Sequence, residues 1–356
     1  MTDRERVLRI FNYQPVDRRP LHLVGPWGDT LERWYGEGLP RDVDLNKFLG
    51  VTPLAMTNVA GIAGIYPTYE TRVLREDDTF KYMIDGYGRT VRDFKHHTSM
   101  PEWLDFAVKT PADLQRVLDE HFDMARLEER FPPEWEARVK KAAASDALIL
   151  TDGGCFYWTL RSLAGVEYAS YLFYDAPELV DELFERYCLV TLEGIRRAAK
   201  LVRIDLIGFG EDIGFKTGPL VSPVMFRQFI LPRYKRIMDL AHSYGINLTW
   251  YDSDGDVRQF IPDYLSVGIN GLAPCEVAAN MIPCELRKTY GRELRLVGGI
   301  DKREIAKGPA AIDAELERNR PVIEEGGFLP AIDHSIPADI SFANYRYFLE
   351  KLQKIV

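Results

Sequence analysis

Apolar and polar positions follow a regular pattern from residue 147 onward. Short apolar runs alternate with long stretches in which apolar residues recur at helical spacing. The short runs cover residues 147–154, 204–212, 247–255, 269–276, 294–301 and 328–334. Strands that alternate with helices in this way pair in parallel through right-handed crossovers. The pattern therefore predicts an α/β fold with a parallel sheet.

The first part of the chain supplies further elements at less regular spacing. Residues 20–25 and 51–58 each contain a strand-like run. The segment 80–96 predicts a hairpin around an Asp-Gly turn, and 110–145 predicts a helical region with a Thr-Pro start. The strand count reaches eight, which predicts a (β/α)8 TIM barrel. We expect one domain over 1–356, in which 60–145 is an inserted region with the hairpin and helices.

Nearly every predicted strand ends in an acidic residue or a histidine. These residues are Asp152, Glu211, Asp212, Asp252, Asp254, Glu276, Asp301 and His334. In a closed barrel such strand ends meet at one mouth. In a doubly wound open sheet, the alternative fold, they would be spread along a ridge. The pattern favours the barrel and predicts a functional site at its carboxyl end.

The motif NLTWYDSDG places Asp252 and Asp254 two residues apart, so both side chains point to one face of a strand. The pair is open to several interpretations. The aspartates could cap the next helix. A calcium loop is a second reading, although Val257 stands where glycine is needed and Asp263 replaces the closing glutamate. The DxDG string is also similar to the nucleophile loop of haloacid-dehalogenase-type phosphatases. The remaining reading is a pair of catalytic carboxylates.

We assign three kinds of role to these residues. The candidate ligands of a divalent metal, most simply zinc, are Asp254, Glu276 and His334, since oxygen and imidazole ligands suit such an ion. The candidate catalytic carboxylates are Glu211, Asp212, Asp252 and Asp301. The candidate substrate-binding residues are Trp27, Asp152 and Arg161. Structural alternatives remain: a cap for His334, ordinary packing for the aromatic residues, and a salt bridge to Lys216 for the Glu211-Asp212 pair, of which only one member can point inward.

Composition narrows the partners to small molecules and proteins. The net charge of −9 argues against nucleic acid or an anionic membrane as the partner. No apolar run approaches the length of a membrane span, and the charged start MTDRERVLRI is unlike a signal peptide. Four widely spaced cysteines without CxxC indicate reduced thiols in a cytoplasmic protein. The absence of GxGxxG, GxxxxGK[ST] and GxSxG leaves classical nucleotide binding and acyl transfer without support.

Several strings together resemble the uroporphyrinogen decarboxylase superfamily, in its branch related to cobalamin-dependent methyltransferases. They are GFGEDIGFKTGPLVSPVMFRQFILPRYKRIMDLAHSYG, DSDGDV, GLAPCEVAANM, RLVGGIDK and GGFLPAIDHSIP. The resemblance implies a (β/α)8 barrel with its site at the carboxyl-end mouth. It also implies one of two chemistries, decarboxylation or methyl transfer.

Departures from the family motifs bear on the choice between these chemistries. The RQAGRY-type motif of true decarboxylases is missing from LHLVGPWGDTLERWYGEG. The His-x-Cys zinc motif of the methyltransferases falls on Asp252-Ser253-Asp254, and their last zinc ligand falls near His334. Oxygen and imidazole thus replace thiolates. The first expectation is a metal-dependent methyltransferase that moves a methyl group between a small methoxylated or methylated substrate and a corrinoid protein. A decarboxylase or lyase acting on a small carboxylated compound, and a non-catalytic binding barrel, are the alternatives.

Overall fold

The structure, a computed structural model, describes residues 1–96 and 100–355. Its centre is a seven-stranded sheet with the strand order β1-β6-β7-β10-β11-β12-β13. The strands are β1 Met56–Asn58, β6 Leu148–Gly154, β7 Leu206–Gly210, β10 Leu248–Asp252, β11 Gly271–Ala273, β12 Arg295–Ile300 and β13 Phe328–Ile332. Every neighbouring pair is parallel. The six strands predicted between residues 147 and 334 are confirmed, and so is the parallel α/β class.

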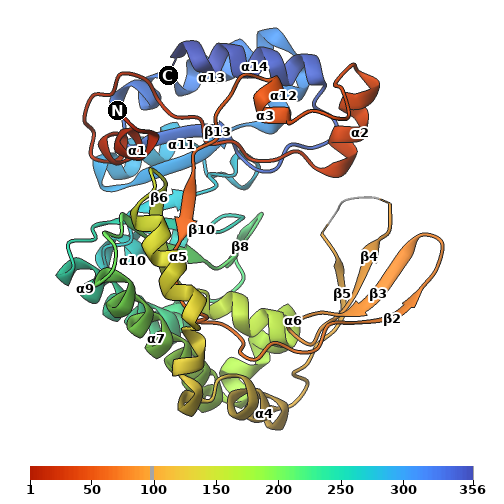
Figure 1. The fold of residues 1–356 in the computed structure, drawn as a ribbon, viewed down its shortest axis with the longest axis vertical. Coiled ribbons are helices and arrows are strands. Elements are labelled where there is room, and N and C mark those ends of the chain that lie inside the picture. Colours follow the sequence, from red (N-terminus) through yellow and green to blue (C-terminus); the bar gives the residue numbers. More distant parts are fainter. Residues whose placement is uncertain (97–99, 356) are drawn as a thin grey trace.

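The segment predicted as the first strand lies between the two edges of the curled sheet. Leu21 forms a parallel bridge to Pro53, just before β1, and Pro26 forms one to Ile336, just after β13. No continuous ladder forms here, because proline lacks the N–H that a ladder needs. The fold is therefore TIM-barrel-like, with seven regular strands and two isolated bridges in place of the predicted eighth strand (Figure 1).

Side chains on one face of the sheet fill its interior. Leu148, Leu206, Leu248 and Leu329 come from four different strands and pack together in one buried cluster. Helix α1 (Asp3–Phe11) adds its buried Val7, Ile10 and Phe11 to this cluster and so plugs the amino end of the sheet. The same cluster includes Trp250, Ala273 and Val297, which also line the cavity described below. The apolar interior thus ends where the polar strand ends begin.

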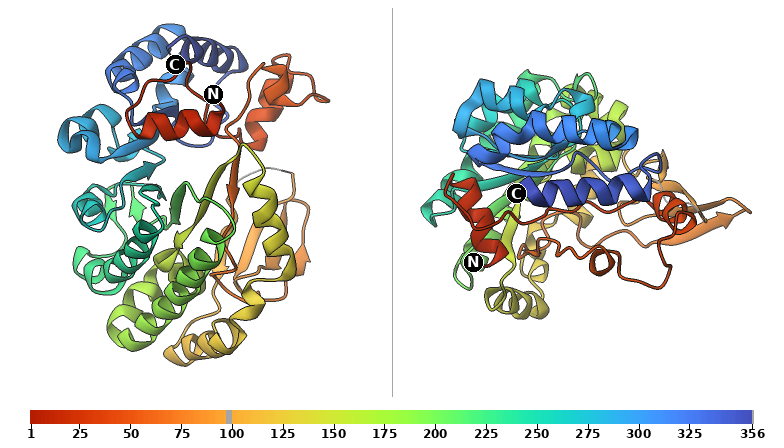
Figure 2. Two further views of the ribbon diagram at one scale, coloured as in Figure 1. Left: turned by 60° about the vertical axis from the view of Figure 1, so that its left-hand side comes forward. Right: turned by 90° about the horizontal axis from the view of Figure 1, so that it is seen from above.

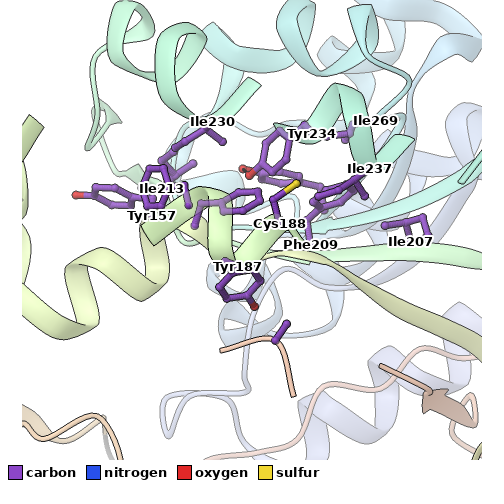
Figure 3. Close-up of a cluster of buried hydrophobic side chains, with 14 of the residues drawn as sticks. Tyr157, Tyr187, Cys188, Ile207, Phe209, Ile213, Ile230, Tyr234, Ile237 and Ile269 are labelled. Carbon is purple, nitrogen blue, oxygen red and sulfur yellow. Dashed lines mark hydrogen bonds between the residues drawn. The ribbon is translucent and has the colours of Figure 1, made fainter. Parts of the chain in front are cut away.

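The other face of the sheet packs against a layer of helices. Ile207 and Phe209 of β7 lie in the larger buried core with Tyr234 and Ile237 of helix α9 (Figure 3). The helices after β6 are α6 Phe156–Asp175, α7 Pro177–Ala199, α8 Pro223–Met225, α9 Leu231–Ser243, α10 Ile261–Ser266, α11 Pro283–Tyr290, α12 Lys302–Lys307, α13 Pro309–Glu325 and α14 Phe342–Ile355. The break predicted near Pro232 is confirmed, because a π-helical turn over Phe226–Ile230 separates α8 from α9.

The stretch between β1 and β6 carries a second, smaller sheet. The predicted hairpin is present as β3 (Phe80–Ile84) and β4 (Thr90–Phe94), and two further strands, β2 (Arg72–Glu76) and β5 (Glu102–Asp105), flank it. All pairs in this sheet are antiparallel. The sheet projects from the body of the molecule beside α6 (Figures 1 and 2).

The helical region predicted over 110–145 is divided. Helix α4 (Pro111–His121) and helix α5 (Pro133–Ala143) are separated by two short 3₁₀ turns. Between them lies the buried Arg130, whose guanidinium donates hydrogen bonds to the carbonyls of Ile62, Gly64 and His121. Two further helices, α2 (Gly28–Gly36) and α3 (Leu45–Phe48), lie between α1 and β1. Within the described residues, no helix is both long and apolar enough to cross a membrane.

Candidate active site

A cavity of about 280 Å³ lies at the carboxyl end of the central sheet. It is lined by His22, Val24, Asp212, Trp250, Asp252, Asp254, Ala273, Pro274, Val297, Gly298, Ile332, His334 and Ser335. These residues come from the bridging segment and from the ends of β7, β10, β11, β12 and β13. A larger hollow of about 480 Å³ lies beside residues 13–19 and 324–326. That hollow is near α1 at the opposite end of the sheet, so the strand-end cavity is the candidate site.

Strand alternation brings Asp252 and Asp254 into the cavity together. Along β10, Leu248 and Trp250 face the interior whereas Tyr251 packs in the outer core. Asp252 and Asp254 continue the inward series, and both line the cavity. The prediction that the two carboxylates share a face is confirmed, and Trp250 belongs to the same row.

Asp212 reaches the cavity through an unusual backbone conformation. Its φ is +41°, in the left-handed region that few residues other than glycine adopt. Its Oδ1 accepts a hydrogen bond from the backbone N–H of Asp254 at 3.2 Å. The two loops also touch at Gly214 and Gly255, where a Cβ on Gly255 would stand 2.5 Å from the Gly214 carbonyl carbon. The loops after β7 and β10 are thereby held in register, and their aspartates face one another.

Asp254 and His334 form a pair across the cavity. The His334 Nε2 lies 3.3 Å from Asp254 Oδ2, and this contact raises the pKa of His334. Trp27 lies beside His334, with ring centroids 6.5 Å apart and planes 26° from parallel. The predicted site residues Asp254, His334 and Trp27 therefore come together at this side of the cavity.

Asp252 has the most strongly raised pKa among the acidic residues that line the cavity. Its side chain reaches solvent through the cavity, but protein surrounds it on the other sides. Burial raises its pKa to about 7, and the nearby carboxylates of Asp212 and Asp254 add to the rise. Burial and Asp254 likewise raise the pKa of Asp212. Among the described residues, no lysine, arginine or histidine lies within ion-pair distance of Asp252. Such acids are characteristic of functional sites.

Arg161 borders the cavity and links it to the small sheet. Its Nη2 donates to Asp212 Oδ2 at 3.2 Å. The guanidinium carbon lies 4.5 Å from the Trp158 ring centroid and 5.7 Å from that of Trp103 on β5. Arg161 thus neutralises part of the acidic charge, as an arginine stacked on aromatic rings can do.

His22 lines the cavity; the sequence left open whether it points into the barrel or simply packs within it. It makes an edge contact with Trp250, with ring centroids 5.1 Å apart. Burial lowers its pKa to about 4, so the imidazole is neutral near pH 7. Alternation back from Asp252 would have identified Trp250. His22 carries no comparable signal, because its position depends on the isolated bridges that close the sheet.

The neutral His22 leads to a direct prediction. Its side-chain NMR resonance, assigned by comparison with a His22→Gln variant, should stay constant between about pH 5 and 8, the range in which exposed histidines titrate. The reason is that the surrounding protein desolvates the ring and, among the described residues, no carboxylate is paired with it. A titration midpoint near pH 6 would contradict this placement of His22.

Glu211 turns away from the cavity, so only Asp212 of the pair faces inward. Its carboxylate is fully buried and accepts hydrogen bonds from the N–H groups of Phe156, Tyr157 and Trp158 at 2.7, 2.8 and 3.1 Å. The Tyr234 hydroxyl donates to the same group at 2.7 Å. Burial raises the pKa of Glu211 to about 7. Glu211 thus caps helix α6 from outside the cavity lining, and its catalytic role stays a prediction.

Asp152 also lies outside the cavity lining. It accepts hydrogen bonds from the N–H of Gly154 at 3.1 Å and from the Tyr187 hydroxyl at 3.1 Å. Thr191 donates to it at 3.5 Å. These partners belong to the end of β6 and to α7, so Asp152 joins strand to helix. The predicted contact between Asp152 and substrate has no counterpart in the cavity.

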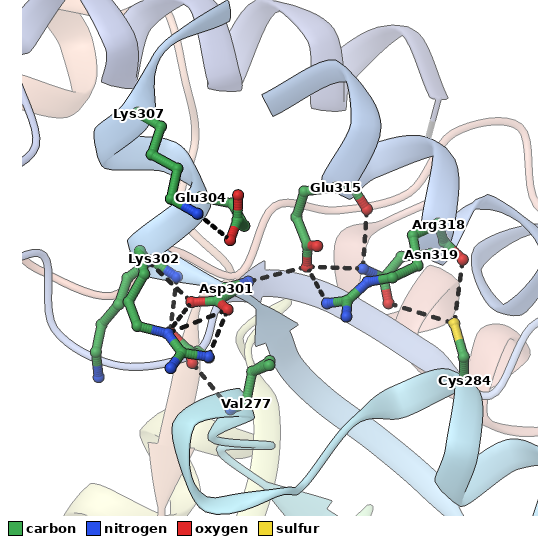
Figure 4. Close-up of polar contacts among 11 residues, drawn as sticks. Val277, Cys284, Asp301, Lys302, Glu304, Lys307, Glu315, Arg318 and Asn319 are labelled. Carbon is green, nitrogen blue, oxygen red and sulfur yellow. Dashed lines mark hydrogen bonds and ion pairs between the residues drawn. The ribbon is translucent and has the colours of Figure 1, made fainter. Parts of the chain in front are cut away.

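Asp301 and Glu276 are occupied by neighbouring basic groups. Asp301 accepts from the Arg303 backbone at 2.9 Å and from its guanidinium at 2.7 Å, which caps α12 and holds the pKa of Asp301 below its usual range (Figure 4). Glu276 accepts from Lys302 Nζ at 3.2 Å and from the Gly255 N–H at 3.4 Å. Neither side chain lines the cavity. Asp301 is thus observed as a cap of α12, and its catalytic role stays a prediction.

The predicted metal ligands do not assemble into a set. Asp254 and His334 are adjacent, but Glu276 is turned to Lys302. Within residues 1–96 and 100–355, no three His, Cys, Asp or Glu side chains converge in a way that could hold a metal ion. The side chains as placed do not fit a three-ligand zinc site. No step proposed below runs through a metal.

A parallel α/β sheet with acidic strand ends around one cavity defines an enzyme-type site at the carboxyl end of a barrel-like fold. The family model for uroporphyrinogen decarboxylase (URO-D) matches residues 156–355. The chain belongs to this family. No curated protein matches the chain. Among solved structures, a methyltransferase from Methanosarcina mazei is 17% identical, with a TM-score of 0.56 over 99% of each chain. At this identity the likeness concerns the fold.

Proposed function

We propose that the chain is a methyltransferase that moves a methyl group from a small, non-anionic methylated substrate to a corrinoid protein. One observation carries the proposal. Three aspartates line the cavity, and no lysine or arginine is among its lining residues. A decarboxylase must hold the carboxylate of its substrate, and an anion would be repelled by Asp212, Asp252 and Asp254. The charge of the cavity therefore favours methyl transfer over decarboxylation, the alternative chemistry of the family.

The residues that line the cavity can assist methyl transfer. As the bond to the methyl group stretches, its electron pair moves to the leaving group and the methyl carbon carries partial positive charge, which carboxylates fixed beside it can stabilise. The apolar floor of Trp250, Ala273 and Val297 would orient the body of the substrate. The methyl group would then face the open side of the cavity, where an acceptor on another protein can reach it. A corrinoid supplies a strong two-electron nucleophile for such a transfer.

The state of the thiols supports a cytoplasmic setting. All four cysteines, Cys155, Cys188, Cys275 and Cys284, are unpaired. Burial raises the pKa of each thiol, which keeps the sulfur protonated and unreactive. We place the protein in the cytoplasm, where reduced thiols persist.

A substrate screen with two readouts tests the proposed reaction. Purified protein would be incubated with a panel of methylated and methoxylated compounds and a panel of small carboxylic acids, with free reduced corrinoid as the acceptor. We expect methylation of the corrinoid, followed by its visible absorbance, with compounds of the first panel and no release of carbon dioxide from the second. Carbon dioxide release without methyl transfer would assign the decarboxylase chemistry instead.

A further inference from the structure

The cavity combines acidic charge with neutral aromatic walls. Asp212, Asp252 and Asp254 face a space that is otherwise bounded by Val24, Pro274 and Ile332 and by the rings of His22 and Trp250. A neutral imidazole and an indole add no positive charge, and the electron-rich faces of such rings attract cations. Trp27 supplies a second indole beside His334. This combination is the chemistry that proteins use to hold quaternary ammonium groups.

The cations already present near the cavity do not satisfy all of its carboxylates. Arg161 pairs with Asp212 from outside the lining residues, and His334 pairs with Asp254. Lys302 is engaged by Glu276. Asp252 is left without an ion-pair partner among the described residues. A carboxylate that faces two others in one cavity is repelled by them unless a cation accompanies it.

His22 provides an independent indication of a ligand. Its ring lines the cavity, and none of the described residues donates a hydrogen bond to it or accepts one from it. His22 is half-buried, so its unpaired ring is open to the cavity and available to contact a ligand there. His22 and Asp252 line the same cavity of about 280 Å³, which limits that ligand to a small molecule.

Building on the proposed methyl transfer, we infer that the substrate of this cavity is a methylated ammonium cation. Asp252 is the counter-ion of that cation, Asp212 and Asp254 add to the field, and Trp250 and His22 form the wall against its methyl groups. The inference rests on the proposed function and names the substrate class for it.

The chemistry of an ammonium donor fits the side chains present. In the transfer, the carbon–nitrogen bond breaks and its electron pair stays on nitrogen, while the electron pair of the acceptor, the reduced corrinoid proposed above, forms the new bond to carbon. The nitrogen leaves as a neutral amine. No proton or Lewis acid has to assist its departure, in contrast to a methoxy group, which would leave as an alkoxide. The incomplete metal-ligand set of Asp254, Glu276 and His334 is therefore compatible with this substrate class.

A charge series of three probes tests the inference on the wild-type protein. Tetramethylammonium, tert-butanol and pivalate share a compact branched core and carry charges of opposite sign or none. Titration calorimetry or ligand-observed NMR would give their affinities. We expect tetramethylammonium to bind about tenfold or more tightly than tert-butanol, and pivalate not to bind. Equal or tighter binding of tert-butanol or pivalate would overturn the inference. The test uses the wild-type protein and does not depend on the folding of a variant.

Two variants locate the cation and a third controls for net charge. Asp252→Asn and Asp254→Asn should each weaken tetramethylammonium binding about tenfold or more. Asp239→Asn removes the same charge from an exposed pair with Lys235 on α9 and should leave binding unchanged. Equal affinities in all three variants and wild type would place the cation elsewhere and overturn the inference.

The two proposals fail in different ways. Methyl transfer from neutral methoxylated compounds, without tetramethylammonium binding, would overturn the cationic substrate and leave the proposed function standing. Cation binding that depends on Asp252, without methyl transfer from any methylated ammonium compound, would support the inferred ligand class and overturn the proposed function.

Discussion

Asp252→Asn is expected to lower the rate of methyl transfer by about 100- to 1,000-fold, the usual loss when one fixed group that stabilises transition-state charge is removed. The protein should remain folded and be no less stable than wild type. The reason is that Asn has the same shape but removes an ion that faces Asp212 and Asp254 without a partner. Initial rates and thermal unfolding of the two proteins would be compared.

The combination of the two measurements separates an active-site role from a structural one. A residue needed only for folding would lose stability and activity together. Asp239→Asn, on the exposed side of α9, is the matched control and should leave both quantities unchanged. A variant at Asp252 that is less stable but retains its specific activity would contradict the role proposed for this carboxylate.

Glu211→Ala is expected to reduce the free energy of unfolding by about 3–5 kcal/mol, the loss typical of removing one partner from a buried charged network. Three N–H groups at the start of α6 and the Tyr234 hydroxyl would lose their acceptor inside the core. Because α6 also carries Arg161, activity should fall as well. Urea unfolding measures the change, and an alanine at the exposed Glu134 on α5 serves as the control. A loss below about 1 kcal/mol would contradict this view of Glu211.

The same carboxylate should make stability depend on pH. Its pKa of about 7 in the folded protein exceeds the ordinary value of 4.5, so the folded state holds its proton more tightly. The stability contributed by the protonated form is complete below about pH 4.5 and is lost as pH rises through 7. The unfolding free energy of wild type should therefore fall, relative to Glu211→Gln, by about 2–3 kcal/mol between pH 5 and 8. A pH-independent difference would show that Glu211 stays ionised throughout.

The two-residue period of the strands allows much of the site to be predicted from the sequence. Alternation along β10 places Asp252 and Asp254 on one face, and the same rule requires that only one of Glu211 and Asp212 can face inward. Both expectations agree with the structure. The rule does not say which of the two faces inward, because that depends on the positive φ of Asp212 after the strand has ended. Strand periodicity therefore predicts which side chains face the site up to the last regular residue of a strand. It does not predict side-chain directions in the loops that follow.

Residues that end strands without entering the cavity could not be separated by the same reasoning. Asp301 is bound by Arg303, two residues further along, in a local cap that any helix start could contain. Glu276 is bound by Lys302, which follows the next strand. Whether the Glu276 carboxylate is paired therefore depends on how two loops meet in space. A sequence shows that both carboxylates stand at strand ends. It does not show which of them is paired with a nearby cation in the folded protein.

The small sheet shows a different limit. The hairpin of β3 and β4 was predictable from its Asp-Gly turn and alternating pattern. The flanking strands are short and exposed, and β2 has no buried residue at all. Its sequence therefore lacks the alternation of buried and exposed positions that would predict a strand. Their link to the site passes through Trp103 and Arg161, a tertiary contact between elements far apart in the chain.

The fate of a labelled methyl group tests the central claim most directly. Wild-type protein, Asp252→Asn and the exterior control Asp239→Asn would each be mixed with a ¹³C-methyl-labelled ammonium compound and reduced corrinoid, and the label followed by NMR through a single turnover. The account predicts that the label moves to the corrinoid with wild type and the control, and about 100-fold or more slowly with Asp252→Asn. Transfer at the wild-type rate in Asp252→Asn would contradict the account.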